Sequence, residues 1–284
     1  DGSPDGETGN AEAPAQLVGK PLNEAAVWQR ALIMAAGAFM NFLLGFVVMV
    51  VLIAAQSEPI TSRVIYAIDD GALCGQTGLE AGDKVLAVNG RRCFVANDML
   101  YELMRTEDYS ARFTVLRGGE KVELPCVRFD TWQDDSGETH MSLGFTVYGI
   151  RKTPANVVKE AWNSVLYYGR IIFTSLMDLL RGRESINDLS GPVGIVTAIG
   201  QAASYGWQDL LQLLVLITVN LGIFNLLPFP ALDGGKVVFL LIEGVTGHAV
   251  PEKIQSGLTL AAFALLFGLM LFATYNDIVR LITG

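Results

Sequence analysis

The sequence is poor in the residue types that build disulfide frameworks and serine-protease sites. Its three cysteines are Cys74, Cys93 and Cys126. An odd number of cysteines does not indicate a disulfide framework, so we expect these cysteines to be small, buried side chains. One bridge stays open as an alternative if this part of the chain faces an oxidising compartment. A Gly-x-Ser-x-Gly motif is also missing, and no plausible histidine and aspartate partners for a catalytic serine are present, which argues against a serine protease.

Positive charge is scarce as well. The chain has 20 Lys and Arg residues against 29 Asp and Glu residues, which gives a net charge of −9 at pH 7. Such an acidic balance argues against nucleic acid as a partner. The acidic residues gather in the polar beginning of the chain and in its middle part, where we expect them to keep these parts soluble.

Charge is absent altogether from three long stretches. They lie between Arg30 and Glu58, between Asp209 and Asp233, and between Lys253 and Asp277. Each is longer than the roughly 20 apolar residues that a membrane-spanning helix needs. With 51% hydrophobic residues and a mean hydropathy of +0.39, the chain is predicted to be an integral membrane protein. Trp28 and Arg30 suit an anchor at the membrane interface just before the first span.

The second uncharged stretch ends in a break. Residues 225–235 read Asn-Leu-Leu-Pro-Phe-Pro-Ala-Leu-Asp-Gly-Gly, so Pro228 and Pro230 stop the helix and the Asp233 carboxylate follows at once. Irregular backbone and a carboxylate at membrane depth are costly unless they line an enclosed or watery site, which indicates a functional Asp233. The alternative is that Asp233 caps a short helix over residues 236–245, with Gly234 and Gly235 easing the turn.

This Asn-x-x-Pro-x-Pro-x-Leu-Asp-Gly pattern resembles the second signature of the site-2 protease family, whose members are intramembrane zinc metalloproteases. The residues that carry the resemblance are Asn225, Pro228, Pro230, Leu232, Asp233 and Gly234. The resemblance implies that Asp233 is the third zinc ligand. It also implies that Asn225 and the bend at Pro228 and Pro230 hold the substrate near the metal.

The family's first signature, His-Glu-x-x-His, is missing from this sequence. In the family its histidines bind zinc and its glutamate is the general base. The only histidines are His140 and His248, and neither begins this pattern. We expect the two histidines and the glutamate to lie in an N-terminal segment that this sequence does not include. The Zn²⁺ site is then incomplete and the chain alone is inactive. A non-catalytic relative of the family is the alternative.

A smaller resemblance lies in the first span. Residues 35–42 read Ala-Ala-Gly-Ala-Phe-Met-Asn-Phe, and they resemble the family's second helix, which packs beside the zinc site. Gly37 and Asn41 are four residues apart and share one helix face, where a small residue permits close packing and an amide can hydrogen-bond across helices. The resemblance implies a place for Asn41 near the active site, while ordinary helix packing is the alternative.

Residues 57–150 change character to short β-type runs separated by turns, with a hairpin signal at Gly118-Gly119. Residues 77–90 resemble the signature of a PDZ domain of the circularly permuted bacterial type. Leu143, Gly144 and Phe145 then match the loop that offers backbone N–H groups to a peptide carboxylate. For Leu143 and Phe145 the alternative is a plain core strand.

The remaining segments complete the expected fold, a multi-span α-helical membrane protein with an inserted α+β PDZ-like domain. Residues 154–182 favour a helix on the membrane surface, with a buried fourth helix as the alternative. The predicted parts are a polar loop segment (1–27), a transmembrane helix (28–56), the PDZ-like domain (57–150), a membrane-surface region with a Ser-Gly-Pro loop (151–206), the motif-bearing transmembrane helix with its short helix (207–250) and a last transmembrane helix (251–284).

The predicted function is cleavage of transmembrane helices in single-span membrane proteins, such as anti-sigma factors or remnant signal peptides. The expected location is the cell membrane with the PDZ-like domain outside, because Lys20 and Arg30 share a side with the loop that holds Asp233, Lys236 and Lys253. The expected partners are the bilayer, the transmembrane substrate and the missing segment. The alternatives are a non-catalytic membrane scaffold with a peptide-binding PDZ domain, and a transporter, although no inverted repeat supports the latter.

Overall fold

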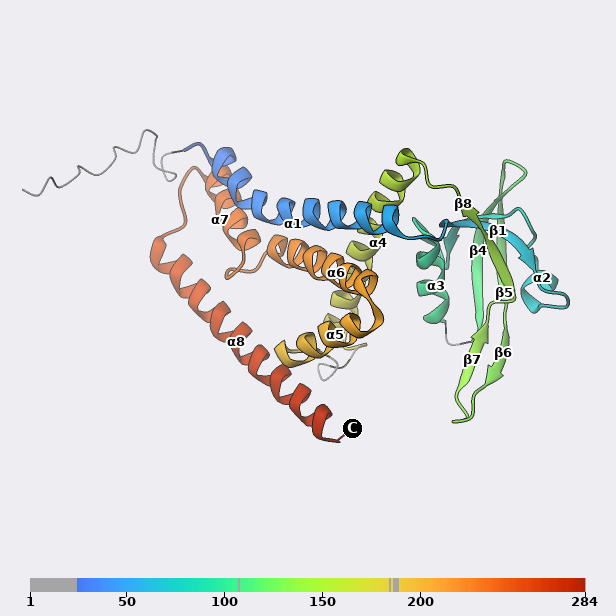
Figure 1. Cartoon of the computed structure of the whole chain (residues 1–284). Coiled ribbons are helices and arrows are strands. Elements are labelled where there is room, and N and C mark those ends of the chain that lie inside the picture. Colours follow the sequence, from blue (N-terminus) through green and yellow to red (C-terminus); the bar gives the residue numbers. More distant parts are fainter. Residues whose placement is uncertain (1–24, 107, 184, 186–188, 284) are drawn as a thin grey trace, which may run out of the picture.

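The computed structural model describes residues 25–283, except 107, 184 and 186–188, so the expected polar segment 1–27 lies almost entirely outside it. A helical region and a sheet-containing region lie side by side (Figure 1). The helices are α1 (Val27–Ala55), α2 (Leu73–Gln76), α3 (Ala96–Met104), α4 (Pro154–Leu180), α5 (Pro192–Tyr205), α6 (Trp207–Leu226), α7 (Asp233–Thr246) and α8 (Glu252–Thr283). The strands are β1 (Ile60–Ile68), β2 (Lys84–Val88), β3 (Arg91–Arg92), β4 (Ser110–Arg117), β5 (Glu120–Arg128), β6 (Asp130–Gln133), β7 (Thr139–Ser142) and β8 (Phe145–Ile150).

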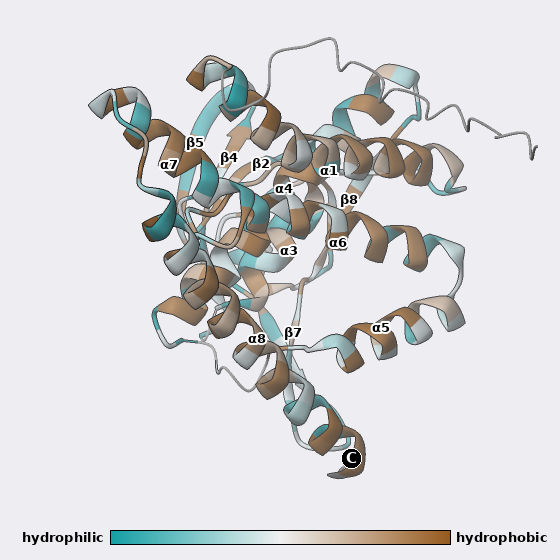
Figure 2. Cartoon of the chain, turned by 90° about the vertical axis from the view of Figure 1, so that its left-hand side faces the viewer, coloured by the Kyte–Doolittle hydropathy of each residue, from teal (hydrophilic) through white to brown (hydrophobic). Residues whose placement is uncertain are grey.

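Three described helices, α1, α6 and α8, are long and apolar enough to cross a membrane, and they coincide with the three uncharged stretches. Figure 2 shows hydrophobic residues along most of α1 and α6. Large apolar side chains also point outward from all three helices, among them Leu43, Leu221 and Phe267. An apolar surface of this kind suits contact with lipid, so the prediction of a membrane protein with three apolar helices is confirmed.

Helices α1 and α6 pack closely in opposite directions. Gly45 on α1 leaves room for Thr218 on α6, because an added Cβ would lie 3.1 Å from the Thr218 hydroxyl oxygen. Gly222 leaves similar room for the ring of Phe42, at 3.0 Å. Since lipid is as apolar as the helices, such small residues drive association by letting the backbones approach. The closely packed helices α1 and α6 thus lie side by side in the helical region (Figure 1).

Helix α8 is held by a carboxylate that reaches the start of α5. Asp277 is buried, and its Oδ2 accepts a hydrogen bond of 2.7 Å from the backbone N–H of Gly194. Glycine is needed here, since a Cβ on Gly191 would lie 2.7 Å from the backbone nitrogen of Thr274, and one on Gly194 would lie 2.9 Å from Asp277 Oδ1. The Ser-Gly-Pro loop is therefore the point at which α5 and α8 meet.

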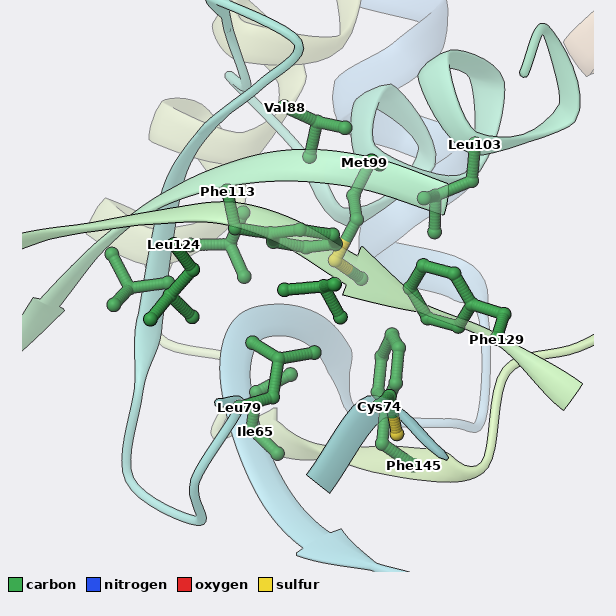
Figure 3. Close-up of a cluster of buried hydrophobic side chains, with 14 of the residues drawn as sticks. Ile65, Cys74, Leu79, Val88, Met99, Leu103, Phe113, Leu124, Phe129 and Phe145 are labelled. Atoms are coloured by element: carbon green, nitrogen blue, oxygen red, sulfur yellow. The ribbon is translucent and has the colours of Figure 1, made fainter. Parts of the chain in front are cut away.

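The sheet-containing region is built on one curved sheet with the strand order β5-β4-β2-β1-β8, to which β3 adds along β2, and on a separate β6–β7 hairpin. Gly118 and Gly119 both have positive φ and form the predicted turn between β4 and β5. Aliphatic and aromatic side chains from the strands, α2 and α3 meet in one core, among them Ile65, Leu79 and Phe113 (Figure 3). Cys74 and Cys93 are buried, Cys126 is exposed, and none forms a disulfide.

Helix α4 joins the two regions. It runs crosswise to α1 and α6 (Figure 1) and buries an apolar stripe against them, made of Val157, Ala161, Val165, Tyr168 and Ile172. It is not among the described helices that could span a membrane. This amphipathic pattern agrees with a helix at the membrane surface, and its position relative to a membrane stays a prediction.

The other side of α4 carries charges that meet α3. Arg170 donates a hydrogen bond to Asp98, and its Nη2 lies 3.6 Å from Glu102 Oε1. Arg105 directly follows α3, and its Nη2 atom lies 2.5 Å from Oδ2 of Asp178 on α4. Asp98 and Glu102 are both buried, and burial raises the pKa of each carboxyl against the opposing effect of Arg170. A network of partly desolvated charges therefore fixes the sheet-containing region to α4.

Replacing Arg170 is expected to loosen this junction. An Arg170→Met variant keeps most of the aliphatic stem but leaves the buried Asp98 and Glu102 carboxylates without their shared cation, which costs about 3 kcal/mol of unfolding free energy. Arg183→Met is the control, because the Arg183 side chain is 65% exposed and lies 3.7 Å from Asp178, and we expect no measurable change there. Urea unfolding in detergent, followed by circular dichroism, measures both. Equal behaviour of the two variants would contradict the assignment.

Glu102 gives the junction a dependence on pH. Because burial raises the pKa of its carboxyl, the folded protein binds this proton more readily than the unfolded chain. Its contribution to stability is therefore largest at low pH and is lost as pH rises from the ordinary glutamate range through the raised value. A Glu102→Gln variant stays neutral, so we expect its melting temperature to exceed that of the unaltered protein increasingly across this window. A constant difference would argue against the effect.

Candidate functional site

The predicted break at the end of α6 is present, and several of its backbone polar groups find partners outside a helix. Helix α6 ends at Leu226, two residues before Pro228. The N–H of Phe229 donates to the Leu227 carbonyl at 2.7 Å, and that of Leu232 donates to the Phe229 carbonyl at 2.9 Å. The Pro230 carbonyl accepts from the hydroxyl of Thr259 on α8, at 3.2 Å. Irregular backbone at membrane depth requires such partners.

Asp233 is the first residue of α7. The N-cap position belongs to Leu232, and no side chain caps this end. The described partner of Asp233 is Lys236, whose Nζ lies 3.3 Å from Oδ1, and the Asp233 side chain is 36% exposed. A negative charge in the first turn is favourable to the helix dipole, yet the carboxylate makes no capping hydrogen bond. It therefore remains available to a ligand, which favours the functional interpretation over the helix cap.

Gly234 and Gly235 let α7 begin against the bend. A Cβ on Gly234 would lie 2.3 Å from the Leu227 carbonyl oxygen, and one on Gly235 would lie 2.2 Å from that of Phe229. Neither glycine has a positive φ. Glycine is therefore needed at these two positions because the backbones lie in close contact, and not because of an unusual φ. This close contact is the physical reason why the turn expected here requires glycine.

The opposite side of the Asp233 carboxylate faces α1. A Cβ on Gly37 would lie 3.7 Å from Asp233 Oδ2, so a side chain longer than alanine at this position would crowd the carboxylate. Asn41 and Asn225 are half-buried. Among the described residues no hydrogen bond joins either amide to Asp233. The structure therefore brings Gly37 and Asp233 together, while the roles of Asn41 and Asn225 stay predictions.

The described residues offer Asp233 alone as a metal ligand at this place. His248 follows the far end of α7, which at 14 residues is about 20 Å long. His140 lies on β7, in the sheet-containing region. A carboxylate suits zinc as one ligand, but a catalytic zinc ion takes three protein ligands. The described residues at this place therefore offer one of the three ligands that a catalytic zinc ion takes, and they do not build a zinc site by themselves.

The structure also brings together a second group of side chains of metal-ligating types, which the sequence did not predict. One of them is His140, to which the sequence assigned no role. The side-chain ligand atoms of Asp134, Glu138 and His140 lie within 4.8 Å of one another on the β6–β7 hairpin. Glu138 and His140 are two residues apart, a spacing that puts side chains of extended backbone on one face, and this was the available signal. Asp134 already accepts hydrogen bonds from Ser136 and from the Glu138 N–H and lies 2.9 Å from the His140 ring. These contacts close the hairpin.

The predicted peptide-binding loop precedes β8, the strand at one end of the sheet. Phe145 is buried in the core and Leu143 packs against it, which agrees with the alternative of a core role for these side chains. Gly144 has a φ of +64°, and its carbonyl accepts from the Asp69 N–H at 2.9 Å. Peptide binding here, and the PDZ identity itself, stay predictions.

Comparison with known proteins gives a consistent result. Residues 5–269 match the model of "Peptidase family M50". The chain is 34% identical over 251 residues to "Zinc metalloprotease RasP" of Geobacillus kaustophilus, which covers 88% of this chain and 59% of the relative. It is 31% identical over 255 residues to "Regulator of sigma-W protease RasP" of Bacillus subtilis, with 90% and 60% covered. It is 30% identical over 275 residues to "Zinc metalloprotease RasP" of Shouchella clausii, with 94% and 62% covered.

The two glycines after Asp233 give a direct test of the bend. We expect Gly235→Ala to destabilise the protein by about 3 kcal/mol, because the added methyl group overlaps the Phe229 carbonyl and forces the backbone apart. Gly257→Ala on α8 is the matched control, since its Cβ meets nothing within 4 Å, and we expect it to stabilise by about 0.5–1 kcal/mol. Thermal unfolding in detergent reports both. A harmless Gly235→Ala would mean that the bend differs from the one described.

Proposed function

The chain belongs to peptidase family M50, and on this premise we propose that it is the main body of an intramembrane zinc metalloprotease in which Asp233 is one zinc ligand. The observation that carries the proposal is the Asp233 carboxylate itself. It follows a broken apolar helix, makes no capping hydrogen bond and faces the open side of Gly37. The chain spans about three fifths of the length of the relatives named above.

We propose that two histidines and a glutamate from a His-Glu-x-x-His segment outside this sequence complete the site. Both histidines of this sequence lie far from Asp233, which supports a source elsewhere. The chemistry that a bound zinc ion supplies is polarisation of the scissile carbonyl and activation of water. The chain by itself is then inactive, and its own contribution is the third ligand and the surface on which the substrate lies.

The proposed substrates are single-span membrane proteins, such as anti-sigma factors or remnant signal peptides. A helical substrate must unwind before cleavage, because its carbonyls are hydrogen-bonded within the helix. Asn225, in the last turn of α6, and the non-helical backbone at Pro228 and Pro230 are the proposed contacts for the unwound segment. The relative named as a regulator of sigma-W protease supports a link to anti-sigma factors.

We propose that the sheet-containing region is a PDZ-like domain outside the cell membrane, with α4 on the membrane surface. It joins α1 at the end opposite to α7 (Figure 1), so the bend and the sheet would face opposite sides of the bilayer. Arg30, Lys236 and Lys253 belong to the side of the bend, and such residues favour the cytoplasm. Peptide binding at Leu143, Gly144 and Phe145 is part of this proposal.

Metal content tests the proposal. We expect about one zinc ion per molecule of the complete protein that contains this sequence, loss of zinc in Asp233→Asn, and no zinc in these 284 residues alone. Asp209→Asn is the control, since Asp209 is an exposed aspartate at the other end of α6. Mass spectrometry of purified proteins gives the counts.

Two other outcomes are informative. Zinc retained in Asp233→Asn would leave Asp233 as a helix-start residue favoured by the helix dipole. A complete protein without zinc would favour a non-catalytic membrane scaffold whose PDZ-like domain recruits peptides.

A further inference from the structure

Helix α7 lies on α1 through three contacts in reverse order. At one end Gly244 packs near Val27, where an added Cβ would lie 3.6 Å from a Val27 methyl group. At the other end Asp233 faces Gly37. Between them Arg30 donates a hydrogen bond to Glu243. The two helices are therefore antiparallel, and the ion pair belongs to the same interface as Asp233.

The ion pair is well shielded from solvent. The Arg30 side chain is 17% exposed and that of Glu243 is 21% exposed. Arg30 Nε is buried and has no hydrogen-bond partner among the described residues. Removing either partner leaves the other charge partly buried and uncompensated, which is strongly unfavourable. Nothing in the sequence indicated this ion pair, and the role of Arg30 as an anchor at the membrane interface stays a prediction.

Lipid is as apolar as the side chains between two membrane helices, so apolar contact by itself gives little preference for one packing register. Sliding α7 by one turn, about 5.4 Å, would place Asp233 against Ile33 or Asn41 instead of Gly37. A shielded ion pair does not tolerate such a slide, since each charge then loses its partner. A buried polar contact that selects one register is the best-attested role of such pairs.

We propose that the Arg30–Glu243 ion pair positions Asp233, by holding α7 in the one register on α1 that places the carboxylate against Gly37. Arg30 and Glu243 are positioning residues and do not touch the metal. The proposal rests on the proposed function, in which Asp233 is a zinc ligand. The remaining ion pair of α7 among the described residues, Lys236 with Asp233, lies within the helix and cannot set its register.

Charge reversal separates this role from a general loss of structure. Arg30→Glu and Glu243→Arg each place like charges together, whereas the double variant restores an opposite pair and leaves the net charge at this end unchanged. In the complete protein we expect each single variant to bind zinc about 10-fold more weakly, as for changes to groups that orient metal ligands. We expect the double variant to recover most of the affinity. Lys253→Glu, an exposed charge at the start of α8, is the control.

A second readout reports the register without any metal. The substitutions Val27→Cys and Gly244→Cys, with the exposed Cys126 changed to serine, place two thiols at the end of the α1–α7 interface. We expect oxidation to join them efficiently in the unaltered background and in the double reversal, and poorly in each single reversal. Melting temperatures of the same proteins identify any variant that has simply unfolded.

The outcomes are distinguishable. Single reversals that keep both zinc affinity and cross-linking would overturn the proposal, as would a folded double reversal that recovers neither. Cross-linking that follows the reversals without a change in zinc affinity would overturn the link to Asp233. Absence of zinc from the unaltered complete protein would overturn the proposed function, while the cross-linking result would still decide whether the ion pair sets the register.

Discussion

The close approach of α7 to the backbone of the bend is the constraint on which the rest of the site depends. Gly234 and Gly235 touch carbonyl groups of the segment between α6 and α7, and any side chain there would push the two apart. This contact lets α7, with Asp233 as its first residue, begin directly against the bend. Thr259 completes the arrangement from α8 by satisfying the Pro230 carbonyl. A break in an apolar helix is tolerated where freed backbone groups find such partners.

Polar contacts between distant segments hold the larger parts together. Arg170 meets carboxylates of α3, Asp277 meets the start of α5, and Arg30 meets Glu243. Each contact involves a group that is largely shielded from water, where an unpaired charge is expensive. The apolar surfaces supply most of the contact area, and these polar groups decide which of many similar packings is adopted.

Much of the helical region was predictable from the sequence, because missing charge is a strong signal. The uncharged stretches predicted α1, α6 and α8, and the two prolines predicted the end of α6. The family resemblance at residues 225–234 is confirmed by the family match. The PDZ identity, the segment boundaries and the roles of Asn41 and Asn225 stay predictions.

The contacts between segments were not predictable, because nothing local marks them. Arg30 and Glu243 are 213 positions apart, and Arg170 and Asp98 are 72 apart. A single sequence does not tell which of its many charges will meet. For the same reason the two glycines after Asp233 were expected to ease a turn, although their neighbours are carbonyl groups of the preceding bend.

The antiparallel packing of α7 on α1 has a consequence for biosynthesis. Because 213 positions separate Arg30 from Glu243, roughly 10 to 40 s of translation pass between the emergence of the two partners. During that interval α1 must remain in the bilayer without its partner α7, which its uncharged length allows. Helix α7 carries Lys236 and Glu243 and is not among the helices that could span a membrane by themselves. It therefore reaches its final place on α1 only after α1 has been inserted, so the contact that brings Asp233 against Gly37 forms late in synthesis.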